Sequence, residues 1–215
     1  MVRAVLLILA FLAVGLGPGL AHAEPLSRPG DMQWAANTPL RWEDFQGPVD
    51  PSASTERVAM TAASLSWGYA YGLERSDGHC FYRISSVDVQ AIFDRQVSWV
   101  RPGHRTARIL EHEQGHFDLT QLFKLKLDDL AGELVGIRRT CKGDSVAVAS
   151  DFTERDAARA VSGLAEKVWQ EHVAAQEAYD EQTRHGILTD VQHMWTETIR
   201  RGLREARWDS LEDLL

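Results

Sequence analysis

The spacing of apolar residues changes abruptly at Pro102-Gly103, and this change restricts the fold more than any other feature of the chain. Between Arg57 and Trp99, apolar residues alternate with polar ones, as in strands with one buried face. Ser76-Asp77-Gly78 interrupts the alternation with turn-forming residues, so an antiparallel hairpin is expected there. After Pro102-Gly103, apolar residues recur at helical spacing. We therefore predict an α+β fold in which an antiparallel sheet, built upstream of Val100, packs on a long helix.

Three helices are expected after the sheet. The first, at about residues 105–137, has an apolar face that also carries His112 and His116. The second begins at Thr153, where Asp156 three residues later resembles a weak capping box, and ends near Gly186. The third covers about residues 190–206. No repeat or long linker divides the chain, so residues 24–215 are predicted to form a single domain.

Residues 1–23 have the parts of a secretory signal peptide. An apolar run follows a single arginine, helix breakers follow the run, and Ala21-His22-Ala23 has the small-residue spacing that signal peptidase accepts. An uncleaved membrane anchor is the alternative, because the apolar run is nearly long enough to cross a bilayer. Cleavage after Ala23 is favoured. It predicts an exported protein, periplasmic or secreted, without stable membrane insertion.

Export bears on the two cysteines, Cys80 and Cys141. In an oxidising compartment such a pair usually forms a disulfide. The loop closed by this bond would contain the whole His-Glu-x-x-His motif described below. Two metal-binding thiolates are the alternative, but no close Cys-x-x-Cys spacing supports them. A disulfide is therefore predicted.

The charge of the chain argues against two classes of partner. The formal net charge is −8, the sequence pI is about 5.5, and no block of five or more basic residues occurs. Nucleic acid and anionic lipid surfaces both require a basic patch. Neither is expected to be a partner.

The stretch "ILEHEQGHFDL", residues 109–119, contains the pattern His-Glu-x-x-His. His112 and His116 lie one helical turn apart, so both imidazoles can bind one ion, and zinc suits this geometry. Glu113 lies beside the first histidine, where it can accept a proton from an activated water. A chance pattern on a helix is the alternative, but two buried histidines and a carboxylate in one turn require a shared partner. The sequence therefore predicts a zinc site.

A catalytic zinc ion needs a third protein ligand and one open position. Leu119 and Leu122 occupy the positions of the Gly and the last His in the metzincin spacing, so that arrangement is excluded. The candidates lie on or just after the second helix, and His185 is favoured because imidazole is a common zinc ligand. The alternatives are His172, which a core position also explains, and Glu171, Glu177 and Asp180.

Four motifs together resemble a known family. "LRWEDFQG", "VSWV", "LEHEQGHFDL" and "YDEQTRHG" are similar to a bacterial family of predicted secreted zinc-dependent proteases, a domain of unknown function, over about residues 40–195. The resemblance implies a zincin-like peptidase fold with His112 and His116 as ligands and Glu113 as the catalytic glutamate. The match at "YDEQTRHG" also strengthens His185 as the third ligand.

The expected function is hydrolysis of peptide bonds by a zinc-activated water, with Glu113 as general base and a peptide or protein as substrate. Tyr179 is a candidate donor to the developing oxyanion, with a core tyrosine as the alternative. An edge strand such as residues 87–93 could pair with the substrate. A zinc amidase acting on cell-wall peptides uses the same groups. A non-catalytic zinc-containing envelope binding module is the alternative from another class, and a fourth protein ligand would favour it.

Overall fold

The computed structural model describes residues 3–4, 27–211 and 214, and it is dominated by one long hairpin. Strand β4 (Ala63–Ser76) pairs antiparallel with β5 (His79–Phe93), as the alternation predicted. The turn between them has two residues, Asp77 with φ 52° and Gly78 with φ 78°. Left-handed backbone at both positions gives the turn that matches the twist of paired strands. The predicted hairpin is confirmed.

A β-bulge explains why the alternation in β5 changes phase. Ala70 pairs with Ser86, but the next residue, Tyr71, pairs with Ile84, so Ser85 is an extra residue on β5. An extra residue shifts the side chains that follow it to the opposite face. Tyr82 and Ile84 before the bulge, and Val89 after it, are therefore all buried in the same core.

Short strands extend the sheet. On β5, β2 (Met32–Gln33) pairs antiparallel near Phe93, and β7 (Arg139–Thr140) pairs antiparallel near the hairpin turn. On β4, β1 (Arg3–Ala4) is parallel. The expectation of a sheet built only upstream of Val100 is therefore wrong for β7, which the chain reaches after the first helix. A separate pair, β3 (Ala59–Met60) and β6 (Trp99–Val100), lies at the opposite end from the hairpin turn.

The three predicted helices are present, but the first ends at Gly132 rather than near residue 137, and the second begins earlier than predicted. They are α1 (Ala107–Gly132), α2 (Val146–Thr183) and α3 (Thr189–Glu205). The predicted start of α2 at Thr153 is wrong, because Ser145 caps the helix earlier by accepting a hydrogen bond from the Val148 N–H. Thr153 is instead fully buried inside the helix. Two short 3-10 helices, Trp42–Asp44 and Trp208–Leu211, complete the elements of the described chain.

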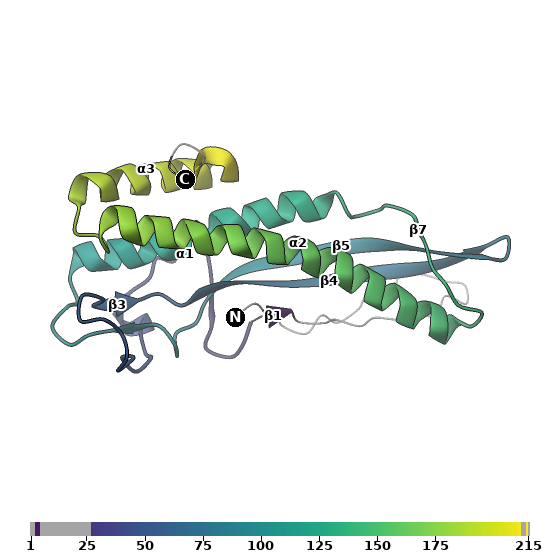
Figure 1. The fold of residues 1–215 in the computed structure, drawn as a ribbon, viewed down its shortest axis with the longest axis horizontal. Helices are drawn as coiled ribbons and strands as arrows, with labels where there is room; N and C mark the ends of the chain where they lie inside the picture. Colours follow the sequence, from purple (N-terminus) through teal and green to yellow (C-terminus); the bar gives the residue numbers. More distant parts are fainter. Residues whose placement is uncertain (1–2, 5–26, 212–213, 215) are drawn as a thin grey trace.

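The helices cover the hairpin in layers: α1 and α2 both pack on the sheet, and α3 packs on α1 and α2 (Figure 1). α2 runs antiparallel to α1 and continues beyond it along the hairpin. The largest core cluster joins the buried faces of the hairpin, α1, α2 and α3. The α+β class and the packing of an antiparallel sheet on the motif helix are therefore confirmed. Among the described residues, no helix combines the length and apolar character needed to cross a bilayer.

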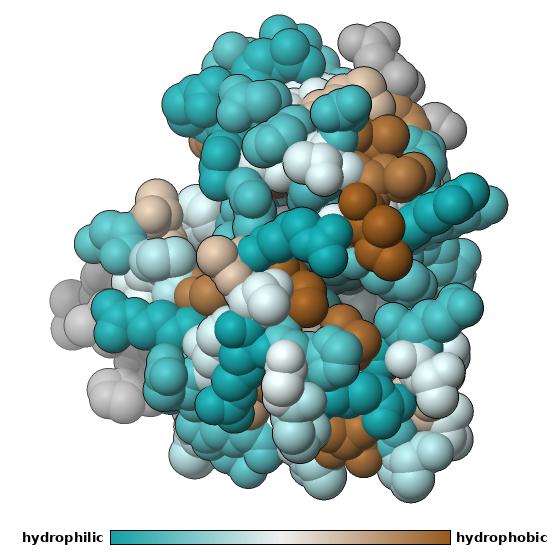
Figure 2. Space-filling view, turned by 90° about the vertical axis from the view of Figure 1, so that its left-hand side faces the viewer, coloured by the Kyte–Doolittle hydropathy of each residue, from teal (hydrophilic) through white to brown (hydrophobic). Residues whose placement is uncertain are grey.

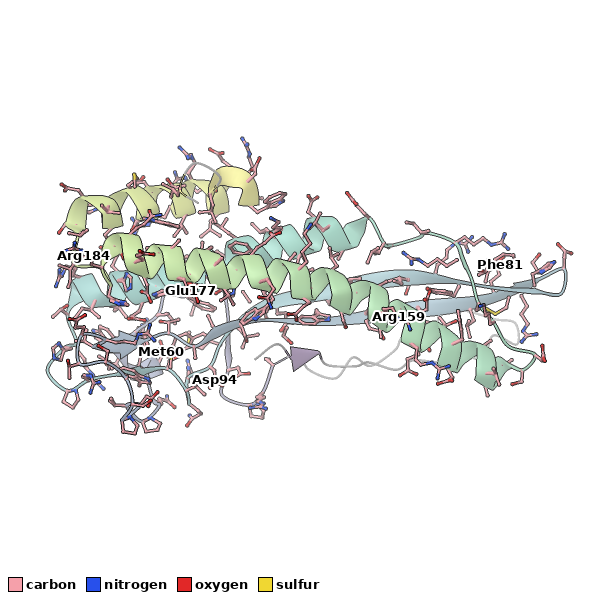
Figure 3. The ribbon with its side chains drawn as sticks, in the orientation of Figure 1. Met60, Phe81, Asp94, Arg159, Glu177 and Arg184 are labelled. Atoms are coloured by element: carbon pink, nitrogen blue, oxygen red, sulfur yellow. A yellow bond between two sulfur atoms is a disulfide. The ribbon has the colours of Figure 1, made fainter. Side chains whose placement is uncertain are left out.

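The structure confirms the predicted disulfide, whereas most of the predicted signal peptide lies outside the described residues. Cys80 on β5 and Cys141 just after β7 form a disulfide with their Cα atoms 5.1 Å apart, which confirms that prediction. The bond lies toward the hairpin end of the molecule (Figure 3). The predicted signal peptide, residues 1–23, falls outside the described residues except for Arg3 and Ala4.

Candidate metal centre

α1 brings the two histidines of the motif together as the spacing predicted. His112 is 2% exposed, and its Nε2 atom lies 3.2 Å from Nε2 of His116. Two nitrogens at zinc-ligand distance from one ion in a tetrahedral arrangement are separated by roughly 3.3 Å. The two imidazoles therefore already have the separation of ligands that share an ion.

The C-terminal end of α2 supplies Asp180, whose carboxylate lies among three histidines. Its Oδ1 atom is 3.0 Å from His112 Nε2, 3.1 Å from His116 Nε2 and 3.0 Å from His185 Nδ1. His112, Asp180 and His185 form a group that could hold a metal ion, and His116 is within hydrogen-bond distance of two members of that group. The structure thus brings together all three predicted ligands, and it adds Asp180 to them.

The charges of this cluster depend on one another. Burial alone would raise the pKa of the Asp180 carboxyl, but hydrogen bonds and positive charge from His112 and His116 outweigh burial and lower it. Burial alone would lower the pKa of His116, but Asp180 and Glu113 outweigh burial and raise it. Asp180 is therefore an ionised carboxylate, the form that binds a metal ion, and a bound cation would replace the histidine protons.

A left-handed turn after α2 places His185. Arg184 has φ 48°, His185 φ 53° and Gly186 φ 77°, and the His185 N–H donates to the Asp180 carbonyl. Left-handed backbone is unfavourable for residues other than glycine, and such strain often occurs at functional sites. At Gly186 the backbone lies so close to α1 that a Cβ atom would be 2.9 Å from the His112 Cβ. The predicted helix end near Gly186 is thus part of the site.

Two glutamines that the sequence interpretation missed orient the histidines. Gln192 Oε1 lies 3.0 Å from His112 Nδ1, and Gln176 Oε1 lies 2.5 Å from His116 Nδ1. Each amide nitrogen donates elsewhere, Gln192 to the Tyr179 hydroxyl and Gln176 to the His116 carbonyl, which fixes the amide orientation. Each Nδ1 atom therefore carries a proton, and each Nε2 atom, which contacts Asp180, can bind a metal ion once the cation replaces any proton there.

Tyr179 packs behind the metal ligands. Its ring stacks on His112 with centroids 4.7 Å apart, and its hydroxyl donates to the His112 carbonyl while accepting from Gln192. It is fully buried, burial raises its pKa, and it is not among the residues that line the cavity described below. A Cβ at Gly115 would lie 2.2 Å from the Tyr179 hydroxyl. The glycine of the motif thus lets α2 approach α1, and Tyr179 has the position of a support for His112 rather than of an oxyanion donor.

Glu113 lines a cavity of about 270 Å³ together with His116, Asp180 and His185. Its side chain is 4% exposed, and its Oε2 atom has no hydrogen-bond partner in the described part of the chain. A buried carboxylate oxygen without a partner is costly and is characteristic of a site that receives a ligand. The opposite walls of the cavity come from the β3 segment, residues 57–63, and from α2, residues 169–180; Met60 and Glu177, one from each wall, are labelled in Figure 3.

The other candidate ligands are not members of the group formed by His112, Asp180 and His185. His172 binds Thr120 and Gln176, Glu171 pairs with Lys126, and Glu177 lines the cavity as an exposed side chain. None of residues 87–93, the strand considered for substrate pairing, lines the cavity, whereas β3 does.

The end of the molecule with the α2–α3 turn shows apolar side chains among hydrophilic ones (Figure 2), and Ile187 and Leu188 of this turn are exposed.

Comparison with known proteins gives no family for this chain. It matches no protein-family model, no curated protein and no solved structure. The resemblance to secreted zinc-dependent proteases therefore stays a prediction from the sequence motifs.

Proposed function

We propose that this protein is an exported zinc-dependent hydrolase of peptide bonds. The observation that carries the proposal is the unpartnered Glu113 carboxylate oxygen, buried in a cavity beside His112, His116, Asp180 and His185. The donor set fits zinc, because imidazole nitrogens and a carboxylate oxygen are ligands that zinc takes in proteins. The Cys80–Cys141 disulfide supports export, since such bonds persist in oxidising compartments.

The residues of the site have separable roles in this proposal. In the hydrolase, three protein groups hold the metal ion, namely His112, His116 and either His185 or Asp180, so that one position stays open for water. Gln176 and Gln192 fix the histidine tautomers. When bound, zinc polarises the scissile carbonyl and lowers the pKa of a water molecule. Glu113 accepts the proton of that water and delivers it to the leaving amine. Its unpartnered oxygen leaves it free to bind the proton.

The position of Asp180 favours a second candidate function. If His112, His116, His185 and Asp180 all bind the ion together, the site is closed by four protein ligands, as in a structural zinc site. The protein would then be a non-catalytic envelope binding module. This candidate leaves the Glu113 carboxylate without a role, which is why the hydrolase is preferred. A cell-wall amidase needs the same groups as the peptidase, and only the substrate distinguishes the two enzymes.

Glu113→Gln tests the proposal most directly. The amide cannot accept the proton, so cleavage of an internally quenched peptide library should fall by roughly two to four orders of magnitude. Zinc content, measured on the purified protein, should stay at one equivalent, because Glu113 is not a ligand. Glu177→Gln is the matched control, since it removes a carboxylate from the same cavity and should leave cleavage nearly unchanged.

Two outcomes would contradict the hydrolase. A wild-type protein with a full equivalent of zinc that cleaves neither library peptides nor cell-wall peptides would favour the binding module. Loss of zinc from folded Glu113→Gln would make Glu113 a ligand or the support of one, and the proposed mechanism would fail.

A further inference from the structure

His172 is a buried histidine that the proposed mechanism does not use. It is 2% exposed and lies on α2 eight residues before Asp180, in the wall of the cavity that Glu113 lines. Its ring packs against Trp169 and Phe123, with centroids 4.9 Å and 5.4 Å away. Burial, with a smaller contribution from His116, lowers the pKa of His172 to about 3, so the ring is neutral at physiological pH.

The surroundings of Nε2 determine where the single proton of His172 lies. Nε2 is 2.8 Å from the amide nitrogen of Gln176 and 3.0 Å from the hydroxyl of Thr120. The Gln176 amide presents its nitrogen to His172 because its oxygen is used by His116 Nδ1. Nε2 of His172 therefore accepts, and a neutral imidazole that accepts at Nε2 carries its proton on Nδ1.

This Nδ1–H has no partner among the described residues. The cavity is thus lined by two residues with unsatisfied polar atoms of opposite kind, the acceptor Glu113 Oε2 on α1 and the donor His172 Nδ1 on α2. A buried donor without a partner costs free energy, as the carboxylate does. A ligand with a hydrogen-bond acceptor at the α2 wall would relieve that cost.

The distance from the metal centre indicates which part of a ligand reaches His172. Eight residues of helix separate it from Asp180, which is about 12 Å along α2, or three to four residues of an extended chain. Trp169 and Val173 beside it add apolar surface to the same wall, and β3 forms the wall opposite. An extended peptide with its scissile bond at Asp180 would therefore place the third or fourth residue from that bond beside His172.

We propose that His172 is a substrate-binding residue whose Nδ1–H donates to a backbone carbonyl of the peptide, three or four residues from the scissile bond. The inference rests on the proposed peptidase function and adds to it a minimum substrate length. We expect this contact to hold the substrate equally in the ground state and the transition state, which is uniform binding. It acts on KM and leaves kcat unchanged.

A matched set of substitutions tests the donor. In zinc-loaded protein, His172→Asn keeps a donor near the Nδ1 position, His172→Gln keeps a polar atom near the Nε2 position for Gln176 and Thr120, and His172→Phe keeps only the ring. The probe is the best-cleaved octapeptide or longer from an internally quenched library, compared with a version cut to two residues on each side of the scissile bond. Zinc content is measured for each variant.

For the long peptide, we expect KM to rise about tenfold in His172→Gln and His172→Phe, and much less in His172→Asn. The short peptide should be cleaved equally by all four proteins. The opposite order, with Gln close to wild type and Asn impaired, would show that His172 only supports Gln176 and would overturn the inference. Equal KM values for all variants on the long peptide would also overturn it, while cleavage by the wild type would leave the peptidase proposal standing. No peptide cleavage by the wild type would overturn both.

Discussion

The two ends of α2 both bury polar side chains, but they satisfy them differently. At the hairpin end, the hydroxyls of Tyr69, Tyr71 and Tyr82 bond to the Glu154 carbonyl, the Ser150 carbonyl and the Asp156 carboxylate of α2. At the metal end, Glu113 and His172, which both line the cavity, each retain a buried atom without a partner among the described residues. The three tyrosine hydroxyls are thus paired at one end of the helix, whereas Glu113 and His172 each keep an unpaired atom at the other.

The difference separates a part of the molecule that maintains the fold from a part that awaits a ligand. Polar groups that are fully hydrogen-bonded within the chain position α2 on the sheet without needing anything else. The Thr153 hydroxyl and the Arg139 Nε atom are exceptions at the hairpin end, because both are buried without a partner in the described chain, but neither residue lines the cavity. Substitutions at the metal end should therefore change zinc binding and activity, and substitutions at the hairpin end should change stability.

The largest effect is expected for the ligands. His112→Ala removes one of two imidazoles on α1 and should weaken zinc binding by at least about 100-fold, measured by competition with a chelator. His185→Ala and Asp180→Asn then rank the remaining ligands, and each should lower zinc affinity and activity. Full zinc retention with normal hydrolysis in His185→Ala would instead assign the third position to Asp180.

At the hairpin end, removal of the disulfide should have the largest effect on stability. Cys80→Ser combined with Cys141→Ser opens a loop with a sequence separation of 61 residues, and the free energy of unfolding should fall by about 4 kcal/mol in the chain-entropy model. Urea titration of the metal-free proteins measures this change. Zinc affinity at 25 °C should be unaltered, and a parallel loss of zinc would show that the two ends are coupled.

Gly115→Ala should lower both the stability and the zinc affinity, because Gly115 is where α1 contacts Tyr179, the residue that supports His112. The new Cβ would lie 2.2 Å from the Tyr179 hydroxyl, and Tyr179 is held between His112 and Trp195. We expect a loss of about 1–3 kcal/mol in unfolding free energy together with weaker zinc binding. Adding Tyr179→Phe removes the closest atom, so the double variant should recover part of both losses. Unchanged stability of the single variant would show that α2 can move away.

Tyr82→Phe should have the smallest effect. Its hydroxyl is 2.5 Å from Asp156 Oδ2, and burial followed by Asp156 raises the pKa of Tyr82 to about 12, so it stays a donor. Removing it should cost about 1 kcal/mol, because the partly exposed Asp156 regains water. Thermal unfolding with and without zinc provides the measurement. The same loss should appear in both states, and a loss confined to the zinc-loaded state would break the distinction between the ends.

Local sequence patterns predicted the secondary-structure elements, whereas the features that were missed depend on long-range packing. Alternation and the Asp77-Gly78 turn predicted the hairpin because both depend on neighbouring residues. The start of α2 was missed because "VAVASDF" before Thr153 has no helical spacing of apolar residues, and its helical form depends on packing against the hairpin. The Ser145 cap was the available signal.

The candidate site shows the same division. His112, Glu113 and His116 are recognisable within one turn of helix, but the central position of Asp180 requires α2 to be placed on α1. The left-handed conformation of Arg184 and His185, residues that rarely adopt it, is not encoded in a local pattern. Gln176 and Gln192 are neutral residues with no diagnostic spacing, so only their contacts with the histidines identify them.

The buried, unpartnered oxygen of Glu113 has an evolutionary consequence. A residue that is unfavourable for folding is retained only while selection acts on what it does, whereas His112 and Asp180 also hold the helices together through their mutual hydrogen bond. In a lineage that no longer needs the reaction, drift should therefore replace Glu113 first. Descendants of this chain with both histidines and Asp180 but an apolar residue at position 113 would be the relics of a lost activity.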